Sequence, residues 1–463
     1  MKRGKTLMTE QKFKMDDAPL NKFHLKITAL TFGSNFSDGY ALGIIGVALT
    51  LLSPQMELNS MWVGLIASSA LVGLFFGSLV LGGLSDRIGR QKIYLLNFLL
   101  VTIASLLQLF VDGPVELLIL RLLIGFALGG DYAVGSTLLA EFAPRKYRGF
   151  LLASLNVLWT VGYVSATIVG YYLGQAGPES WRWMLASAAI PAFIVLILRI
   201  GTPESPQWLV SMGRIDEARH IVKKYIGPNA EIDETVIETQ NKNGFRALFN
   251  KKFRKRTAFG SLLYVCIVIP YFAIYTFLPS ILNSMGLAEN FTVDLWLNIF
   301  LILGSIAGLW LMEKFSRRGF TISTFAILTV CLLMLSIFHE PKLLVIPIFL
   351  AFTFILSANS NLTLTYPAEL FPTEIRASGV GFVTAFSRIG SAIGTFLLPL
   401  SMNTIGLDAS MIGMTAILLI GTIISIAWAP ETKSLSLSGA SNPFNEESDS
   451  NSNLNPLNHK KIN

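Results

Sequence analysis

The chain has 463 residues, of which 52% are hydrophobic and only 14% are charged, and its mean hydropathy is +0.57. A water-soluble domain carries roughly 25% charged residues, so a soluble protein of this length is excluded. The formal net charge of +7 would suit a nucleic-acid-binding protein. Because the Lys and Arg residues follow a membrane topology, as described below, no nucleic-acid partner is expected.

Apolar runs of about twenty residues, the length that crosses a bilayer as a helix, recur along the chain. Six runs lie within 27–201 and six more within 258–430. A polar linker, 202–257, separates the two sets, and polar segments flank them at 1–26 and 431–463. The sequence therefore predicts an all-α membrane protein with twelve transmembrane helices in two pseudo-symmetric six-helix bundles. Such long runs exclude a β-barrel, whose strands alternate over about ten residues.

The loops between the predicted spans differ in charge on the two sides of the membrane. Most Lys and Arg residues fall in the N-terminal segment, the linker and alternate short loops, which the positive-inside rule places in the cytoplasm. Both termini are thus expected to be cytoplasmic, in an inner (plasma) membrane. In the linker, apolar residues from Trp208 to Val222 recur at helical spacing and predict one short amphipathic helix. The tail, 431–463, is rich in Ser and Asn and is expected to be disordered.

Three short motifs recur at the same place in each predicted bundle. Asp86-Arg87-Ile88-Gly89-Arg90 follows span 2, and Glu313-Lys314-Phe315-Ser316-Arg317 follows span 8. Ala140-Glu141 follows span 4, and Ala368-Glu369 follows span 10. Pro203-Glu204 ends span 6, and Pro430-Glu431 ends span 12. This repetition predicts duplicated halves. Duplicated bundles suit alternating access, in which the halves rock around a site near the middle of the bilayer.

The segment from Gly82 to Lys92, between spans 2 and 3, resembles the loop signature of the major facilitator superfamily. Further stretches resemble its sugar porter and metabolite–proton symporter branch, and they are Arg121 to Gly125, Ala140 to Gly149, Trp181-Arg182-Trp183 and Pro203 to Leu209. The resemblance covers nearly the whole chain and implies a secondary transporter. It also implies a charge network that acts as a cytoplasmic gate, formed by Asp86, Arg87, Gly89, Arg90, Glu141, Arg148, Glu204, Glu369 and Arg376.

Four ionisable residues lie well inside the predicted spans, where a charge is costly and therefore marks a functional candidate. These residues are Asp38, Arg121, Asp131 and Arg388. A buried carboxyl group that gains and loses a cationic neighbour can change its protonation, as proton coupling requires. Asp38, Asp131 and Arg121 are the candidate proton-coupling residues. The alternatives are a static buried ion pair for Asp38, a structural polar network for Asp131 and a lipid-headgroup anchor for Arg121. Arg199, near the end of span 6, can snorkel to the surface and is interpreted as structural.

Span 1 reads Ser37-Asp38-Gly39-Tyr40-Ala41, whereas sugar porters carry Gly-Tyr-Asp at this place. Their carboxylate is therefore missing at Ala41. The Asp-Gly-aromatic motif of aromatic-acid and related metabolite symporters matches better. In the sugar porter branch, the arginine that matches Arg121 partners the carboxylate of span 1.

Arg388 places a guanidinium group near the middle of span 11, where it suits bidentate binding of a carboxylate or phosphate. The glutamine pairs expected of a hexose transporter are absent from spans 5 and 7, which disfavours hexoses. The candidate substrate-binding residues combine this arginine with aromatic and amide side chains, and they are Arg388, Tyr40, Asn156, Tyr163, Tyr271, Tyr275 and Asn359. Ordinary helix packing is the alternative for each aromatic member.

The sequence thus predicts a secondary active transporter that moves a small organic anion by proton symport. Its expected partners are the substrate, protons and the lipid bilayer, with the chain acting as a monomer. No phosphate-binding loop, metal-ligand cluster or nucleophile–base pair is evident, so neither a cofactor nor an enzyme is expected. The alternatives are a facilitative sugar or metabolite uniporter, a drug exporter and a nutrient sensor that does not transport. An exporter would usually carry a proline-rich signature in span 5, which is absent.

Overall fold

The computed structural model describes residues 13–232, 244–287, 291–338, 342–371 and 375–432, which are almost wholly helical. The helices of the first half are α1 (Lys22–Gln55), α2 (Ser60–Ile88), α3 (Arg90–Leu107), α4 (Pro114–Phe142), α5 (Arg145–Gly174), α6 (Ser180–Ser187) and α7 (Ala189–Arg199). Those of the second half are α11 (Arg254–Thr276), α12 (Leu278–Ser284), α13 (Phe291–Lys314), α14 (Arg317–Ile337), α15 (Lys342–Ser360), α16 (Leu362–Leu370) and α17 (Arg376–Trp428). The shorter elements are β1 (Phe13–Lys14), η1 (Met15–Asp17), η2 (Gln108–Phe110), α8 (Pro206–Ser211), α9 (Ile215–Tyr225), β2 (Ala230–Glu231) and α10 (Gly244–Ala247).

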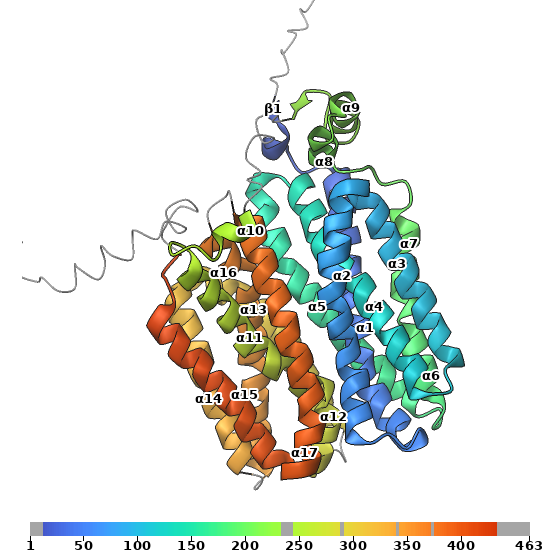
Figure 1. Cartoon of the computed structure of the whole chain (residues 1–463), viewed down its shortest axis with the longest axis vertical. Coiled ribbons are helices and arrows are strands. Elements are labelled where there is room, and N and C mark those ends of the chain that lie inside the picture. Colours follow the sequence, from blue (N-terminus) through green and yellow to red (C-terminus); the bar gives the residue numbers. More distant parts are fainter. Residues whose placement is uncertain (1–12, 233–243, 288–290, 339–341, 372–374, 433–463) are drawn as a thin grey trace, which may run out of the picture.

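Eleven stretches of the described chain are long and apolar enough to cross a membrane. The last of them, α17, has 53 residues and is broken at Gly406, where φ is 87° and ψ is 169°. Its two arms supply two spans, so the described chain provides the twelve predicted crossings. Helices α6 and α7 together form one span, as do α15 and α16. Figure 1 shows the two halves side by side, with α1–α7 on the right and α11–α17 on the left.

We call the end that carries α8, α9 and α10 the linker end, and the opposite end the far end (Figure 1). At the linker end, β1 pairs in parallel with β2, and Asp16 forms an ion pair of 2.7 Å with Arg148. The prediction of one amphipathic linker helix is wrong, because Gly213 adopts a φ of 76° and separates α8 from α9. The predicted disorder concerns a tail that, from residue 433 on, lies outside the described residues.

Glycines allow α2 and α4 to pack backbone against backbone. A Cβ atom built on Gly77 would lie 1.9 Å from the carbonyl oxygen of Phe126, and one on Gly125 would lie 2.0 Å from that of Ala70. No side chain fits at such separations. Small residues at helix contacts replace the hydrophobic driving force that is missing between helices in lipid. This packing makes the first half a compact unit.

Gly77→Ala is expected to lower the thermal stability of the purified protein, because its methyl group would force α2 and α4 apart. Overpacking of this kind costs about 1–3 kcal/mol. Gly83→Ala is the matched control on the same helix, since a Cβ atom there meets nothing within 4 Å. Thermal unfolding of both variants in detergent provides the measurement. Equal melting temperatures for the two variants would contradict this account of the α2–α4 contact.

The two halves touch most extensively along two flanks, α2 against α17 and α5 against α13. At the far end, the glycine at position 64 packs against the carbonyl oxygen of Phe396, and the Asn403 amide donates to Ser60 over 3.4 Å. On the same side, Gly46 packs against the carbonyl oxygen of Thr276. These contacts close the space between the halves at the far end. The functional site therefore lies between the halves, on the linker side of the closure.

Candidate functional site

A cavity of about 170 Å³ lies between the halves, lined by residues of α1, α4, α5, α11, α15, α16 and α17. An engineered cavity of about 150 Å³ is known to hold one benzene ring, so this space suits a small molecule. Five of the predicted site residues line it, namely Asp38, Asp131, Asn156, Tyr271 and Arg388. Sequence reasoning missed other lining residues, among them Asn35, Tyr132, Ser136, Tyr264, Thr363 and Thr384.

Two carboxyl groups face each other on the first-half wall of the cavity. Asp38 and Asp131 are only 1% and 2% exposed, and they interact directly with each other. One oxygen of each carboxyl group has no hydrogen-bond partner. An unpaired buried oxygen is costly, which marks a place for a proton or a ligand. The geometry thus joins two candidates that lie far apart in the sequence.

Arg199 supplies a positive charge that acts on Asp131 through space. Its guanidinium group stacks on the ring of Tyr94 at 3.6 Å and donates to the hydroxyl of Thr31 over 3.1 Å. The interpretation that Arg199 can snorkel to the surface is wrong, since its side chain is buried. The residue lies at the last position of α7, and α7 packs against α3, which carries Tyr94. The position of Arg199 at the end of its helix does not by itself predict its contact with Tyr94 on another helix.

Arg121 does not partner the span 1 carboxylate. It is 1% exposed and donates to the carbonyl oxygen of Ala41 over 2.9 Å, while its Nε and one terminal nitrogen have no hydrogen-bond partner. Asp131, ten residues and about 15 Å further along α4, takes the place opposite Asp38. Arg121 is therefore a buried cation outside the cavity, next to the position where sugar porters carry their carboxylate.

Arg388 provides the positive charge on the opposite wall. It is 5% exposed, and its guanidinium carbon lies 4.9 Å from the ring centre of Tyr132 and 5.8 Å from that of Phe272. Within the described residues it forms no ion pair, and its Nε has no hydrogen-bond partner. Cation–π contacts orient a guanidinium group without neutralising it. Arg388 is consequently free to bind an anion in the cavity.

Four predicted substrate-binding residues lie outside the cavity. Tyr40 turns away from it and bonds Ser187 over 2.8 Å between hydroxyl oxygens. Tyr163 and Tyr275 pack edge to face beyond the cavity wall, toward the far end. Asn359 lines a separate space of about 20 Å³. Asn156 lines the main cavity, but its amide nitrogen donates across to the second half.

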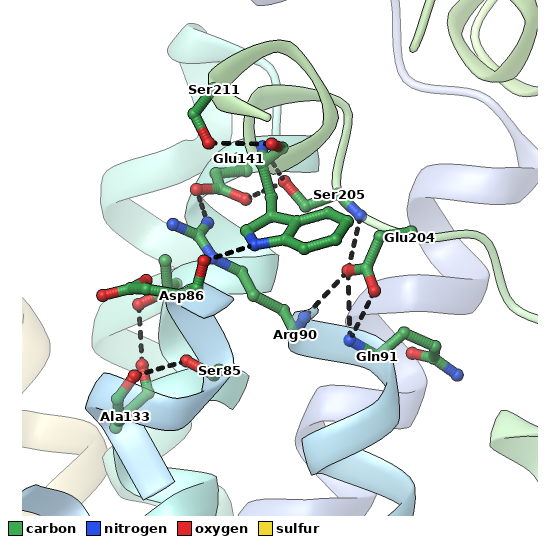
Figure 2. Close-up of polar contacts among 12 residues, drawn as sticks. Ser85, Asp86, Arg90, Gln91, Ala133, Glu141, Glu204, Ser205 and Ser211 are labelled. Atoms are coloured by element: carbon green, nitrogen blue, oxygen red, sulfur yellow. Dashed lines mark hydrogen bonds and ion pairs between the residues drawn. The ribbon is translucent and has the colours of Figure 1, made fainter. Parts of the chain in front are cut away.

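Three of the predicted gate residues, Arg90, Glu141 and Glu204, are connected at the linker end of the first half (Figure 2). Arg90 forms an ion pair with Glu141, and Glu141 also accepts a hydrogen bond from the Ser205 hydroxyl. The Glu204 carboxylate accepts from the backbone nitrogen atoms of Arg90, over 3.0 Å, and of Gln91, over 3.1 Å. Glu204 thereby caps the start of α3.

The remaining first-half gate residues have distinct places. Asp86 contributes its backbone carbonyl, which accepts from the Trp208 indole over 2.8 Å. Gly89 adopts a φ of 116° between α2 and α3, and a Cβ atom there would meet the Glu204 carboxylate at 2.5 Å. Arg87 lies in the last turn of α2, with an exposed side chain. Arg148 pairs with Asp16 and not with a gate residue.

The second half repeats this arrangement at the equivalent helices. Arg317 pairs with Glu369 over 3.3 Å, as Arg90 pairs with Glu141. The Glu431 carboxylate accepts from the backbone nitrogen of Arg317 over 3.0 Å and so caps α14. The Thr432 hydroxyl donates to Glu369 over 2.5 Å. The side chain of Arg376 lies outside the described residues. All these described contacts are made within one half.

Glu204→Ala is expected to destabilise the first half, because two backbone N–H groups at the start of α3 would lose their acceptor. Loss of a cap costs about 0.5–2 kcal/mol, and the carboxylate also favours the positive helix end. Hydrogen exchange at the first turn of α3 should accelerate. Glu217→Ala, which removes an exposed partner of Arg214, is the control and should leave stability unchanged. Unaltered exchange in Glu204→Ala would contradict the capping role.

Comparison with known proteins agrees with this geometry. Residues 26–444 match the model of the sugar (and other) transporter family, which covers nearly all of the chain. The chain belongs to this family, within the major facilitator superfamily. An inner membrane metabolite transport protein of Escherichia coli, YgcS, is 48% identical over 94% of this chain and 98% of its own length.

Two further proteins are similar to this transporter. A niacin transporter of Acinetobacter baylyi is 29% identical over 81% of this chain and 87% of its own. The partially occluded, inward-open structure of the Escherichia coli xylose transporter XylE covers 90% of this chain and 100% of its own, with a TM-score of 0.76 at 18% identity. The structural likeness shows the fold alone.

This transporter is therefore a multi-pass protein of the inner membrane that moves a small metabolite or sugar, and it is not an enzyme. Within the part of the chain that the structure describes, no three His, Cys, Asp or Glu side chains gather where they would hold a metal ion. The chemistry of the cavity comes from two carboxyl groups, one guanidinium group and aromatic rings.

Proposed function

We propose that this transporter is a proton-coupled symporter of small organic anions, with the linker end in the cytoplasm. The single observation that carries this proposal is the placement of opposite functions on opposite walls of one cavity. The first half contributes the Asp38–Asp131 pair, and the second half contributes Arg388. Each half thus holds one of the two co-transported charges, a proton and an anion.

The carboxyl pair fits a proton carrier. Two carboxylates in contact within a low-dielectric interior repel each other strongly, so a proton held between them relieves the repulsion. Arg199 lies close enough to Asp131 to compensate one negative charge after the proton leaves. Proton uptake and release at this pair would therefore change the net charge of the first-half wall by one unit.

The opposite wall fits an anion with a flat ring. Arg388 offers a guanidinium group without an ion-pair partner, Tyr271 and Phe272 add aromatic faces from the same half, and Trp159 adds one from the first half. One guanidinium group facing two carboxyl groups favours a monoanion over a dianion. The relative named as a niacin transporter handles a single-ring acid of this size, which supports an aromatic monocarboxylate as cargo. The Asn156 amide nitrogen donates both of its hydrogen bonds to the second half, so only the amide oxygen remains to accept from the hydroxyl groups of a sugar.

Purified protein in proteoliposomes with an internal pH dye tests the proposal. Nicotinate, benzoate, lactate, succinate, phosphate and xylose are added outside, one at a time. We expect a monocarboxylate to acidify the lumen faster than it does in protein-free liposomes, which correct for passive entry of the neutral acid. Asp38→Asn should abolish this difference while keeping exchange of radiolabelled substrate between the two sides.

Other outcomes point elsewhere. Saturable uptake without any proton movement would replace symport by facilitated diffusion. Proton movement driven by xylose alone would overturn the assignment of an anion. Normal coupling in Asp38→Asn would remove that residue from the proton pathway.

A further inference from the structure

A hydrogen-bonded bridge connects the two halves at the level of the cavity. The amide nitrogen of Asn156 on α5 donates to the Ser360 hydroxyl over 2.9 Å and to the Asn361 side-chain oxygen over 2.8 Å. Asn361, between α15 and α16, donates in turn to the carbonyl oxygen of Ser305 on α13 over 2.8 Å. The chain of bonds therefore runs from the first half through two helices of the second.

The first-half end of the bridge is anchored in a close helix pair, α1 with α5. A Cβ atom on Gly39 would lie 1.9 Å from the carbonyl oxygen of Trp159, and one on Gly162 would lie 2.0 Å from that of Phe36. These backbone contacts, one and two helical turns after Asn156, fix α5 against α1. Because α1 carries Asp38, the bridge and one member of the carboxyl pair belong to the same rigid pair of helices, whereas Asp131 lies on α4.

The second-half end is anchored in the same way. A Cβ atom on Gly304 would lie 2.3 Å from the carbonyl oxygen of Phe354, and one on Gly308 would lie 2.6 Å from that of Ala358. These contacts join α13 closely to α15. Asn361, one position after α15, is buried beside Gly308. Two rigid helix pairs thus meet through one polar connection.

We propose that the bridge formed by Asn156, Asn361 and Ser305 is a hinge that stays bonded while the halves rock. Rocking has to separate the far-end contacts, such as Ser60 with Asn403, before the cavity can open on that side. The bridge lies on the α5–α13 flank and level with the cavity, close to the axis of such a rotation. Contacts near an axis change little, whereas contacts at the ends break.

The hinge gives Asn156 a role different from cargo recognition. Its side chain lines the cavity, but its donor is committed to the second half, so it acts as a positioning residue that keeps the two walls in register. The inference rests on the alternating-access part of the proposed function. It depends neither on proton coupling nor on the identity of the cargo.

Crosslinking tests the hinge without any substrate. In a Cys266→Ala, Cys331→Ala background, Asn156→Cys with Asn361→Cys places a thiol pair at the hinge. Ser60→Cys with Asn403→Cys places the control pair at the far end. Each pair is joined by the same short bifunctional thiol reagent. Dyes attached through non-natural amino acids at Glu57 and Ser284, both exposed at the far end, report opening by single-molecule energy transfer.

We expect the uncrosslinked protein and the hinge-crosslinked protein to exchange between two far-end distances, and the far-end crosslink to hold a single short distance. A hinge crosslink that also stops exchange would overturn the proposal, since the bridge would then have to break. Continued exchange with the far end crosslinked, or a single distance before crosslinking, would overturn the rocking itself. If only a single distance is seen before crosslinking, proton-coupled uptake in proteoliposomes still tests the proposed function independently.

A second measurement covers variants that fold poorly when crosslinked. The bridge stays bonded in both states, so its loss should favour neither of them. Asn156→Ala should leave the ratio of the two far-end distances unchanged, and Asn156→Gln, which keeps an amide donor, should behave alike. A bridge that breaks on opening would instead shift this ratio about thirtyfold in Asn156→Ala, as the loss of two hydrogen bonds predicts. A shift of that size would overturn the hinge.

Discussion

Arg388→Gln is expected to lower the affinity for a transported monocarboxylate about 30-fold or more. Removing one partner of a buried, hydrogen-bonded charge pair costs about 2–5 kcal/mol, and each 1.4 kcal/mol is a factor of ten. Arg388→Lys keeps the charge but loses the planar fork, so an intermediate loss of about tenfold is expected. Isothermal titration with nicotinate and benzoate in detergent provides the measurement.

The melting temperature of the substrate-free variant shows whether Arg388 binds substrate or only stabilises the fold. Arg388 makes no ion pair within the described residues, so its removal relieves a buried charge and should not lower the melting temperature of the substrate-free protein. Tyr40→Phe is the control for affinity, because Tyr40 lies outside the cavity and loses only its bond to Ser187. Unchanged affinity in Arg388→Gln, or a large loss of stability without substrate, would make Arg388 a structural residue.

Asp131→Asn is expected to abolish uphill accumulation while leaving exchange intact. In electroneutral symport of one proton with a monoanion, a gradient of one pH unit supports about tenfold accumulation, because one unit is worth about 1.36 kcal/mol. Asparagine keeps the shape of the side chain beside Asp38 but cannot carry the proton. Radiolabelled nicotinate is therefore expected to reach equal concentrations inside and outside proteoliposomes that carry Asp131→Asn, an inside-to-outside ratio of about one, when the outside is acidic.

Asp294→Asn is the matched control for this prediction. Asp294 is a carboxyl group in the first turn of α13 that accepts from the Asn298 amide over 3.1 Å, and it does not line the cavity. We expect this variant to accumulate substrate as the unmodified protein does. Accumulation by Asp131→Asn, or its loss in Asp294→Asn as well, would place the proton pathway elsewhere.

The long apolar runs and the paired motifs were sufficient to predict the fold. Length and hydropathy specify a membrane-spanning helix directly, and a repeated motif specifies duplicated halves. The prediction of a single linker helix was wrong because it depended on the backbone angle of Gly213, which an apolar pattern does not report. Of the sequence candidates, Asp38, Asp131 and Arg388 reach the cavity because a charge inside a span needs a polar neighbour or a water-filled space.

Aromatic residues were less predictable for a physical reason. Neighbouring positions on a helix point about 100° apart, and α1 has no marked amphipathic stripe that would show which face meets the cavity. Tyr40 is two positions from Asp38 and consequently faces Ser187. Arg199 was missed because its partners, Thr31 and Tyr94, come from other helices. Their proximity follows from tertiary packing, which a single helix pattern does not contain.

The capping carboxylates bear on how the polypeptide is assembled during its synthesis. Glu204 follows directly after the sixth span, so everything that fastens α3 and α4 has left the ribosome before any helix of the second half is made. The first bundle can then be completed in the membrane as a finished piece. Glu431 stands at the same point after the twelfth span, so α14 waits for its cap until the last helix has been translated. Biogenesis would thus proceed in two stages, each ended by a single glutamate.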